Sequence, residues 1–163
     1  MRDFIVDHPI EFKGKVNIGR FVIIEEGCNI GKNVVIGDFC KIYKGTKIGD
    51  NSIIGSFTRT GKNCIIGKNC IVKCHSIISP DTVVGDNVFI GPRVTILHMT
   101  DANKHLPCSI GDGVFIGSST TIMPGVDISN HITIGACSQV RKSITTVGIY
   151  FGNPCGTRPN RRG

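Results

Sequence analysis

The chain has 163 residues, a formal net charge of +7, 21 glycines, eight cysteines and no tryptophan. Its length predicts one domain, and no stretch is apolar for long enough to be a signal peptide or to cross a membrane, so we expect a cytoplasmic protein without a membrane partner. The positive charge favours an anionic partner. Nucleic acid is not expected as that partner, because no aromatic residues are interleaved with the lysines and no nucleic-acid-binding motif is present.

Isoleucine or valine recurs at every sixth residue through most of the chain. The series starts at Ile18, stops after Ile96, and resumes in a shifted register from Ile110 to Val140. A short fixed period of this kind is typical of the stacked coils of a β-solenoid. We therefore predict an all-β solenoid over residues 1–163 that is already in register near Phe12, with no separate sugar-nucleotide-binding domain before it.

Each six-residue unit is predicted to form one short strand and one corner, because side chains alternate between the two faces of a strand. The repeating aliphatic residue points inward, and so does the residue four positions later, which is small or β-branched. Four cysteines take this second inward position: Cys28, Cys40, Cys64 and Cys70. Since buried free cysteine behaves as a small hydrophobic residue, disulfides are not expected.

The break in the series predicts an enlarged turn at residues 98–107. Placing Cys108 in the second inward position restores the register and leaves these ten residues as a loop. Insertions in a solenoid emerge from one edge and commonly carry function. This one holds two of the five histidines, His98 and His105. Residues 146–163 are predicted to form a short C-terminal tail.

The sequence around this loop resembles hexapeptide-repeat acyltransferases. The matching segments are residues 91–96, 110–126, 140–144 and 152–154. The resemblance extends over essentially the whole chain, and it is strongest to the short acetyltransferases that modify sugars or nucleotide-linked sugars. It implies a left-handed parallel β-helix, a triangular solenoid of about seven coils, and a homotrimer with active sites between its subunits.

In such a triangle, residues eighteen apart share a face. Sorting the outward residues by face puts a continuous apolar stripe on one face: Val35, Ile53, Ile71, Phe89 and, after the shift in register, Phe115. The other two faces mix in polar or charged residues such as Asn29 and Arg59. Because a soluble monomer is not expected to expose such a stripe, we predict that it is the surface through which the trimer forms.

The resemblance also implies transfer of an acetyl group from acetyl-CoA, as co-substrate, to an amino or hydroxyl group of a sugar. The attacking group must lose a proton, and histidine is suited to accept it near neutral pH. His98 is the first candidate, because related enzymes use a histidine of this loop as the base. His105 and His75 are the alternatives, and for each of the three the competing interpretation is a solvated turn histidine.

His75 belongs to a column of corner residues. Phe21, Phe39 and Phe57 precede it at intervals of eighteen, and Arg93, Ser119 and Cys137 follow it in the same corner. We predict that the three phenylalanine rings stack on one another. A platform for a base or a sugar is the less favoured alternative, because the first rings lie far from the expected acyl group.

For acetyl-CoA, the resemblance implies two groups of binding residues. Pantetheine would contact backbone groups of four small residues: Gly117, Ser118, Gly135 and Ala136. The phosphates would contact three basic side chains: Arg141, Lys142 and Arg158. The competing interpretation is ordinary turn geometry for the small residues and a solvated edge for the basic ones.

Two other functions compete with the acetyltransferase. One is a non-catalytic solenoid that acts as a scaffold. The other is a metal hydratase like the γ-class carbonic anhydrases, which need three histidines on zinc. The candidate histidines here are separated by 23 and 7 residues, without the paired-corner spacing of that class, so no metal is expected. The sequence does not distinguish N- from O-acetylation or identify the acceptor.

Overall fold

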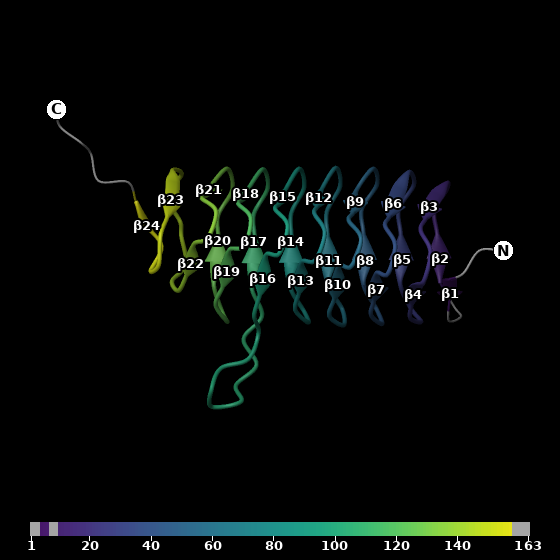
Figure 1. Ribbon diagram of the computed structural model, residues 1–163, viewed down its shortest axis with the longest axis horizontal. Coiled ribbons are helices and arrows are strands. Elements are labelled where there is room, and N and C mark those ends of the chain that lie inside the picture. The colour runs from purple at the N-terminus through teal and green to yellow at the C-terminus, as the bar shows by residue number, and fades with distance from the viewer. Residues whose placement is uncertain (1–3, 7–9, 158–163) are drawn as a thin grey trace.

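The computed structural model describes residues 4–6 and 10–157. They form a long, narrow β-solenoid in which β1 and β24 lie at opposite ends (Figure 1). Successive strands enter three sheets in rotation, so each turn of the solenoid adds one strand to each sheet. No helix of the described residues is long and apolar enough to cross a membrane.

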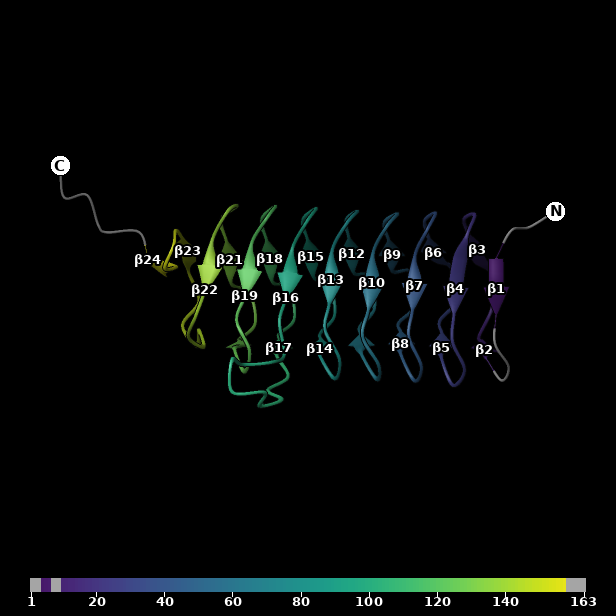
Figure 2. The same cartoon turned by 60° about the horizontal axis from the view of Figure 1, so that its bottom comes forward.

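Sheet 1 has eight strands, and Figure 2 shows most of them side by side. They are β1 (Phe4–Val6), β4 (Val22–Ile24), β7 (Lys41–Ile42), β10 (Arg59–Thr60), β13 (Ile77–Ile78), β16 (Thr95–Ile96), β19 (Thr121–Ile122) and β22 (Gln139–Val140). Sheet 2 has seven strands. They are β2 (Glu11–Phe12), β5 (Asn29–Ile30), β8 (Lys47–Ile48), β11 (Ile65–Ile66), β14 (Val83–Val84), β17 (Ser109–Ile110) and β20 (Asp127–Ile128).

Sheet 3 has nine strands. They are β3 (Val16–Ile18), β6 (Val34–Ile36), β9 (Ile53–Ile54), β12 (Ile71–Val72), β15 (Phe89–Ile90), β18 (Phe115–Ile116), β21 (Thr133–Ile134), β23 (Ile149–Phe151) and β24 (Gly156–Thr157). Strand pairs are parallel, apart from the antiparallel pair β23–β24. The predicted left-handed parallel β-helix is confirmed. It has about eight turns rather than seven, because the first strand pairs with β4 and the irregular β23 still pairs with β21.

The core consists of ladders of inward side chains. Ile24 and Ile42 are paired in neighbouring strands, and both are completely buried. The four cysteines of the second inward position are buried free thiols, as predicted, and each donates to a backbone carbonyl fifteen residues later. Burial raises the pKa of Cys40 and of Cys64 to about 11, so these thiols stay protonated at neutral pH.

The corners of the triangle differ in their side chains. We name each by the sheets that it joins: corner 1–2 (for example residues 61–64), corner 2–3 (67–69) and corner 3–1 (73–75). In corner 2–3, the side-chain amides of Asn33, Asn51, Asn69 and Asn87 form a hydrogen-bonded ladder. The same position of corner 3–1 holds Phe21, Phe39, Phe57 and His75, whose ring centroids lie 4.9, 4.9 and 4.7 Å apart. The predicted aromatic stack is therefore confirmed, and His75 is its upper member.

The predicted apolar stripe lies on the outer face of sheet 3. Strand pairing places its five residues in one row, and the rings of Phe89 and Phe115 stack at 4.8 Å. Sheet 2 also exposes two neighbouring aliphatic side chains, Ile65 and Val83, which the sequence-based stripe did not include. The continuous row of five remains a feature of sheet 3.

Candidate functional site

Residues 98–107 leave the solenoid between β16 and β17 as a projecting hairpin (Figures 1 and 2). Met99 and His105 form an antiparallel bridge, and the amide of Leu106 donates to the carbonyl oxygen of His98 at 2.7 Å. After the hairpin, the chain returns to the register of the solenoid, since Ser109 pairs with Val83 in sheet 2. The predicted enlarged turn is confirmed, and its paired base holds His98 and His105 at corner 1–2.

The two histidines of the hairpin base lie against each other and beside Asp81. The rings of His98 and His105 meet edge to face, with centroids 5.3 Å apart, and His105 Nε2 lies 2.9 Å from Asp81 Oδ2. Within the described residues, the His98 ring itself has no hydrogen-bond partner. Burial, reinforced by the charge of His105, lowers the pKa of His98 against the opposing effect of Asp81. At neutral pH the imidazole of His98 is therefore uncharged and available to accept a proton.

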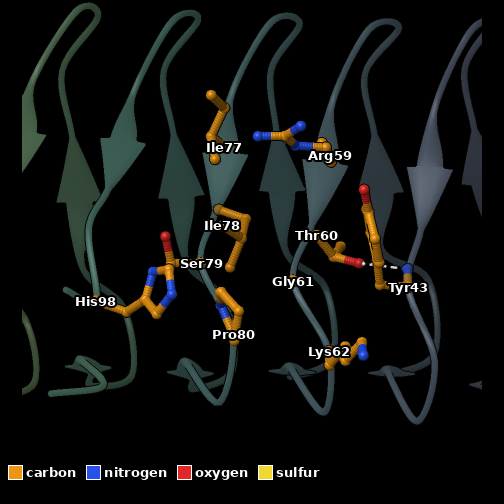
Figure 3. A pocket seen from close by; sticks show the side chains of 10 residues that line it. All are labelled: Tyr43, Arg59, Thr60, Gly61, Lys62, Ile77, Ile78, Ser79, Pro80 and His98. Atoms are coloured by element: carbon orange, nitrogen blue, oxygen red, sulfur yellow. Dashed lines mark hydrogen bonds between the residues drawn. The ribbon is translucent and has the colours of Figure 1, made fainter. Parts of the chain in front are cut away.

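His98 also lines a pocket of about 280 Å³ on the outer face of sheet 1. Figure 3 shows the imidazole at one end beside Ser79 and Pro80, with Lys62 and Arg59 farther along. Tyr43 closes the far side, where its backbone N–H donates to Thr60 Oγ1 at 3.0 Å. Sequence reasoning missed these residues as part of the site, although the outward position of Arg59 on this face follows from the six-residue period.

His75 lies at the opposite edge of sheet 1, in corner 3–1. Its ring stacks on Phe57, and it borders a second hollow of about 410 Å³ together with Lys41, Arg59 and Ile77. The structure thus brings His98 and His105 together and separates His75 from them by the width of the sheet. Among residues 4–6 and 10–157, no group of three or more His, Cys, Asp or Glu side chains is arranged so that it could hold a metal ion.

The residues implied for acetyl-CoA fall into two groups on opposite edges of sheet 1. Gly117, Ser118, Gly135 and Ala136 occupy successive turns of corner 3–1. These turns are so close that a Cβ on Gly117 would come within 2.4 Å of the Ala136 nitrogen. Arg141 and Lys142 are exposed beyond β22 at corner 1–2, where Arg141 Nε donates to Gln139 Oε1 at 2.6 Å. Arg158 lies outside the described residues.

Comparison with known proteins identifies one matching family. The chain matches the bacterial transferase hexapeptide family (six repeats) over residues 27–62, 63–98 and 107–142. No curated protein matches it significantly.

Solved structures share the fold at low sequence identity. The UDP-N-acetylglucosamine O-acyltransferase LpxA from Moraxella catarrhalis is 20% identical, with 95% of this chain and 72% of that chain covered and a TM-score of 0.78. The N-acyltransferase AntD from Bacillus cereus, in complex with dTDP and coenzyme A, is 22% identical, with 82% and 83% covered and a TM-score of 0.73.

PerB from Caulobacter crescentus, in complex with CoA and GDP-perosamine, is 17% identical, with a TM-score of 0.70. The match covers 77% of this chain but only 57% of PerB, so the chain spans little more than half of that protein. At these identities the likeness to all three is one of fold.

Proposed function

Because this chain belongs to the bacterial transferase hexapeptide family, we propose that it is an acyl-CoA-dependent acyltransferase that acts on a sugar. The acyl group is acetyl, and the acceptor is an amino or hydroxyl group of a sugar or nucleotide-linked sugar. One observation carries this proposal: a half-buried His98, whose pKa is lowered by burial, lines the sheet 1 pocket with no hydrogen-bond partner among the described residues. AntD and PerB, which share the fold, were crystallised with CoA and a nucleotide or nucleotide sugar. The free thiols fit a reducing compartment, so we place the protein in the cytoplasm.

His98 acts as the general base in this proposal. The amine or hydroxyl of the sugar bonds to the carbonyl carbon of the thioester while His98 accepts its proton. The carbon–sulfur bond then breaks, and the sulfur leaves as a thiol with the proton from His98. His105 is a positioning residue, because Asp81 holds its Nε2 while its ring lies edge-on to His98.

The cofactor residues support a site between subunits. Gly117 and Ala136, with their neighbours, present backbone to pantetheine along corner 3–1, and Arg141 and Lys142 present positive charge to phosphates at corner 1–2. A single subunit keeps these corners on opposite edges of sheet 1. Both groups contact one CoA molecule if corner 3–1 of one subunit faces corner 1–2 of the next.

Titration with acetyl-CoA by calorimetry, in phosphate-free buffer, tests the proposed function. We expect saturable binding of about one molecule per subunit, and at ~100 times Kd the ligand should add about 2.7 kcal/mol to the stability, seen as a raised Tm. Arg141→Gln should weaken this binding, whereas Lys68→Gln, the same charge change at corner 2–3, should not. A folded protein that does not bind acetyl-CoA would contradict the acyltransferase and favour the scaffold.

We further propose that the stripe on sheet 3 forms a homotrimer. Phe115 stacks on Phe89 and remains 43% exposed in the isolated chain. Phe115→Asp should dissociate the trimer into monomers in sedimentation equilibrium, because the interface would bury an unpaired charge. Ile65→Asp on sheet 2, where Ile65 is 41% exposed, is the matched control and should leave the trimer intact. A wild-type monomer, or a trimer that survives Phe115→Asp, would refute this interface.

A further inference from the structure

Two depressions adjoin on the outer face of sheet 1. The pocket lined by His98 and the hollow bordered by His75 share Arg59 and Ile77 as lining residues, and we call the two depressions together the groove. The segment from Phe57 to Lys62 crosses this face: Phe57 stands at corner 3–1, Arg59 points outward from β10, and Lys62 stands at corner 1–2. The groove therefore runs from an aromatic edge, past Arg59, to the histidine of the hairpin.

Positive charge dominates this groove. Among the described residues that line the two depressions, none is aspartate or glutamate. Lys41 is already engaged, since its Nζ lies 3.2 Å from Glu25 Oε1 and 4.3 Å from the centroid of the Tyr43 ring. Arg59, by contrast, has no side-chain hydrogen bond or ion pair within residues 4–6 and 10–157. Its guanidinium is a fork of donors that suits an oxyanion with several acceptors.

Lys62 adds a second positive charge to the same pocket. It makes no ion pair with a described residue, although its charge contributes weakly to the lowered pKa of Glu25. The second hollow adds apolar surface, because Phe39, Phe57 and Ile77 are among the residues that line it. Phe39 and Phe57 have positive φ values of 57° and 61°. The equivalent position of corner 2–3 holds asparagine, a residue that tolerates this conformation. The groove thus combines two cations with an apolar side.

We propose that this groove binds an acceptor that carries a phosphoryl group, with Arg59 as its main anchor and Lys62 as its second cation. The proposal rests on the proposed function and narrows it to phosphorylated sugars, free or nucleotide-linked. Neighbouring strands lie about 4.8 Å apart, so β10 is about 10 Å from β16, which leads into His98. A sugar ring with a phosphate on its far carbon spans this gap, and its amine or hydroxyl then meets the imidazole. The two positive charges of Arg59 and Lys62 favour a phosphoryl group over a carboxylate, which carries only one negative charge.

The 163-residue chain without acetyl-CoA allows a direct test with two probes, pyrophosphate and UDP. We expect both to bind saturably in calorimetry, and Arg59→Gln to raise both Kd values about tenfold or more. Lys62→Gln should have a smaller effect in the same direction. Lys47→Gln makes the same charge change on the outer face of sheet 2 and should leave both Kd values unchanged. Bound pyrophosphate should also raise the pKa of His98 in an NMR titration, and at the same pyrophosphate concentration Arg59→Gln should reduce that rise.

The outcomes separate this site from the acyltransferase itself. A tighter Kd for UDP than for pyrophosphate identifies a nucleoside diphosphate as the source of the phosphoryl group, and equal values identify a simple sugar phosphate. The proposal would be overturned if neither probe bound saturably, or if wild type and Arg59→Gln had equal Kd values. It would also be overturned if only Arg141→Gln lost binding of the two probes. Because acetyl-CoA binding is measured separately, the phosphoryl site can fail while the acyltransferase stands.

Discussion

Replacing His98 with alanine is expected to lower kcat by about 10²- to 10⁴-fold and to leave the Kd of acetyl-CoA nearly unchanged. The variant loses the proposed acceptor of the proton from the attacking amine or hydroxyl, but it keeps corner 3–1 and the basic residues beyond β22. Steady-state kinetics with amino sugars and nucleotide-linked amino sugars as acceptors, with calorimetry in parallel, measures both quantities.

His131→Ala is the matched control, because it removes an exposed histidine at corner 2–3, away from the sheet 1 pocket. Its kcat should stay close to that of the wild type, whereas His75→Ala tests the second candidate base. Wild-type kcat in His98→Ala would refute the role of His98, and a large loss in His75→Ala alone would move the base to corner 3–1.

The pH dependence of kcat/KM provides an independent check of the same residue. A base must be uncharged to act, and burial with the charge of His105 lowers the pKa of His98 below the ordinary value of about 6.5. Activity should therefore persist below pH 6.5 and decline only as the pH falls through the lowered pKa. His105→Gln removes the like charge and should move this decline to higher pH. A decline at higher pH in the wild type than in His105→Gln would contradict the assignment.

Replacing Ile66 with alanine is expected to lower the free energy of unfolding by about 2–5 kcal/mol. Ile66 is 2% exposed and lies in an inward ladder between Ile48 and Val84. The substitution removes buried methyl and methylene groups and leaves a cavity, because the stacked coils above and below are held by their own backbone hydrogen bonds. Urea unfolding followed by circular dichroism measures the change.

Ile65→Ala is a closely matched control, since the residue is the same, the strand β11 is the same, and only the direction of the side chain differs. Ile65 points outward and is 41% exposed, so its replacement should cost less than about 1 kcal/mol. Equal losses of stability in the two variants would mean that the inward and outward positions of sheet 2 are not those described.

The six-residue period was sufficient to assign the direction of side chains along almost the whole chain. Ile24 and Ile42 are buried, Cys28 and Cys40 share the interior with them, and Phe89 and Phe115 point outward. These predictions succeed because alternation along a strand is local, so two or three residues decide which side is buried. The shift in register at Ile110 located the hairpin for the same reason.

The candidate site could be predicted only in part. The hairpin and its two histidines follow from the interrupted period, but the contact of His105 with Asp81 depends on how the hairpin folds back on corner 1–2. The sequence did not suggest the role proposed for Arg59, because that proposal depends on two depressions that both include Arg59 in their lining. Neither the shape of a groove nor the absence of a partner for a charge is encoded in spacing along the chain.

By itself, then, the sequence determined the solenoid, its inward ladders, its free cysteines and the place of its one predicted large insertion, because each depends on a short repeat. The tertiary structure alone decided which candidate histidines meet, which corner holds each group of candidate cofactor residues, and where positive charge faces the groove. These features join residues that are one to several turns apart. Their proximity depends on how three strands close each turn and on how the hairpin folds back, and local alternation specifies neither.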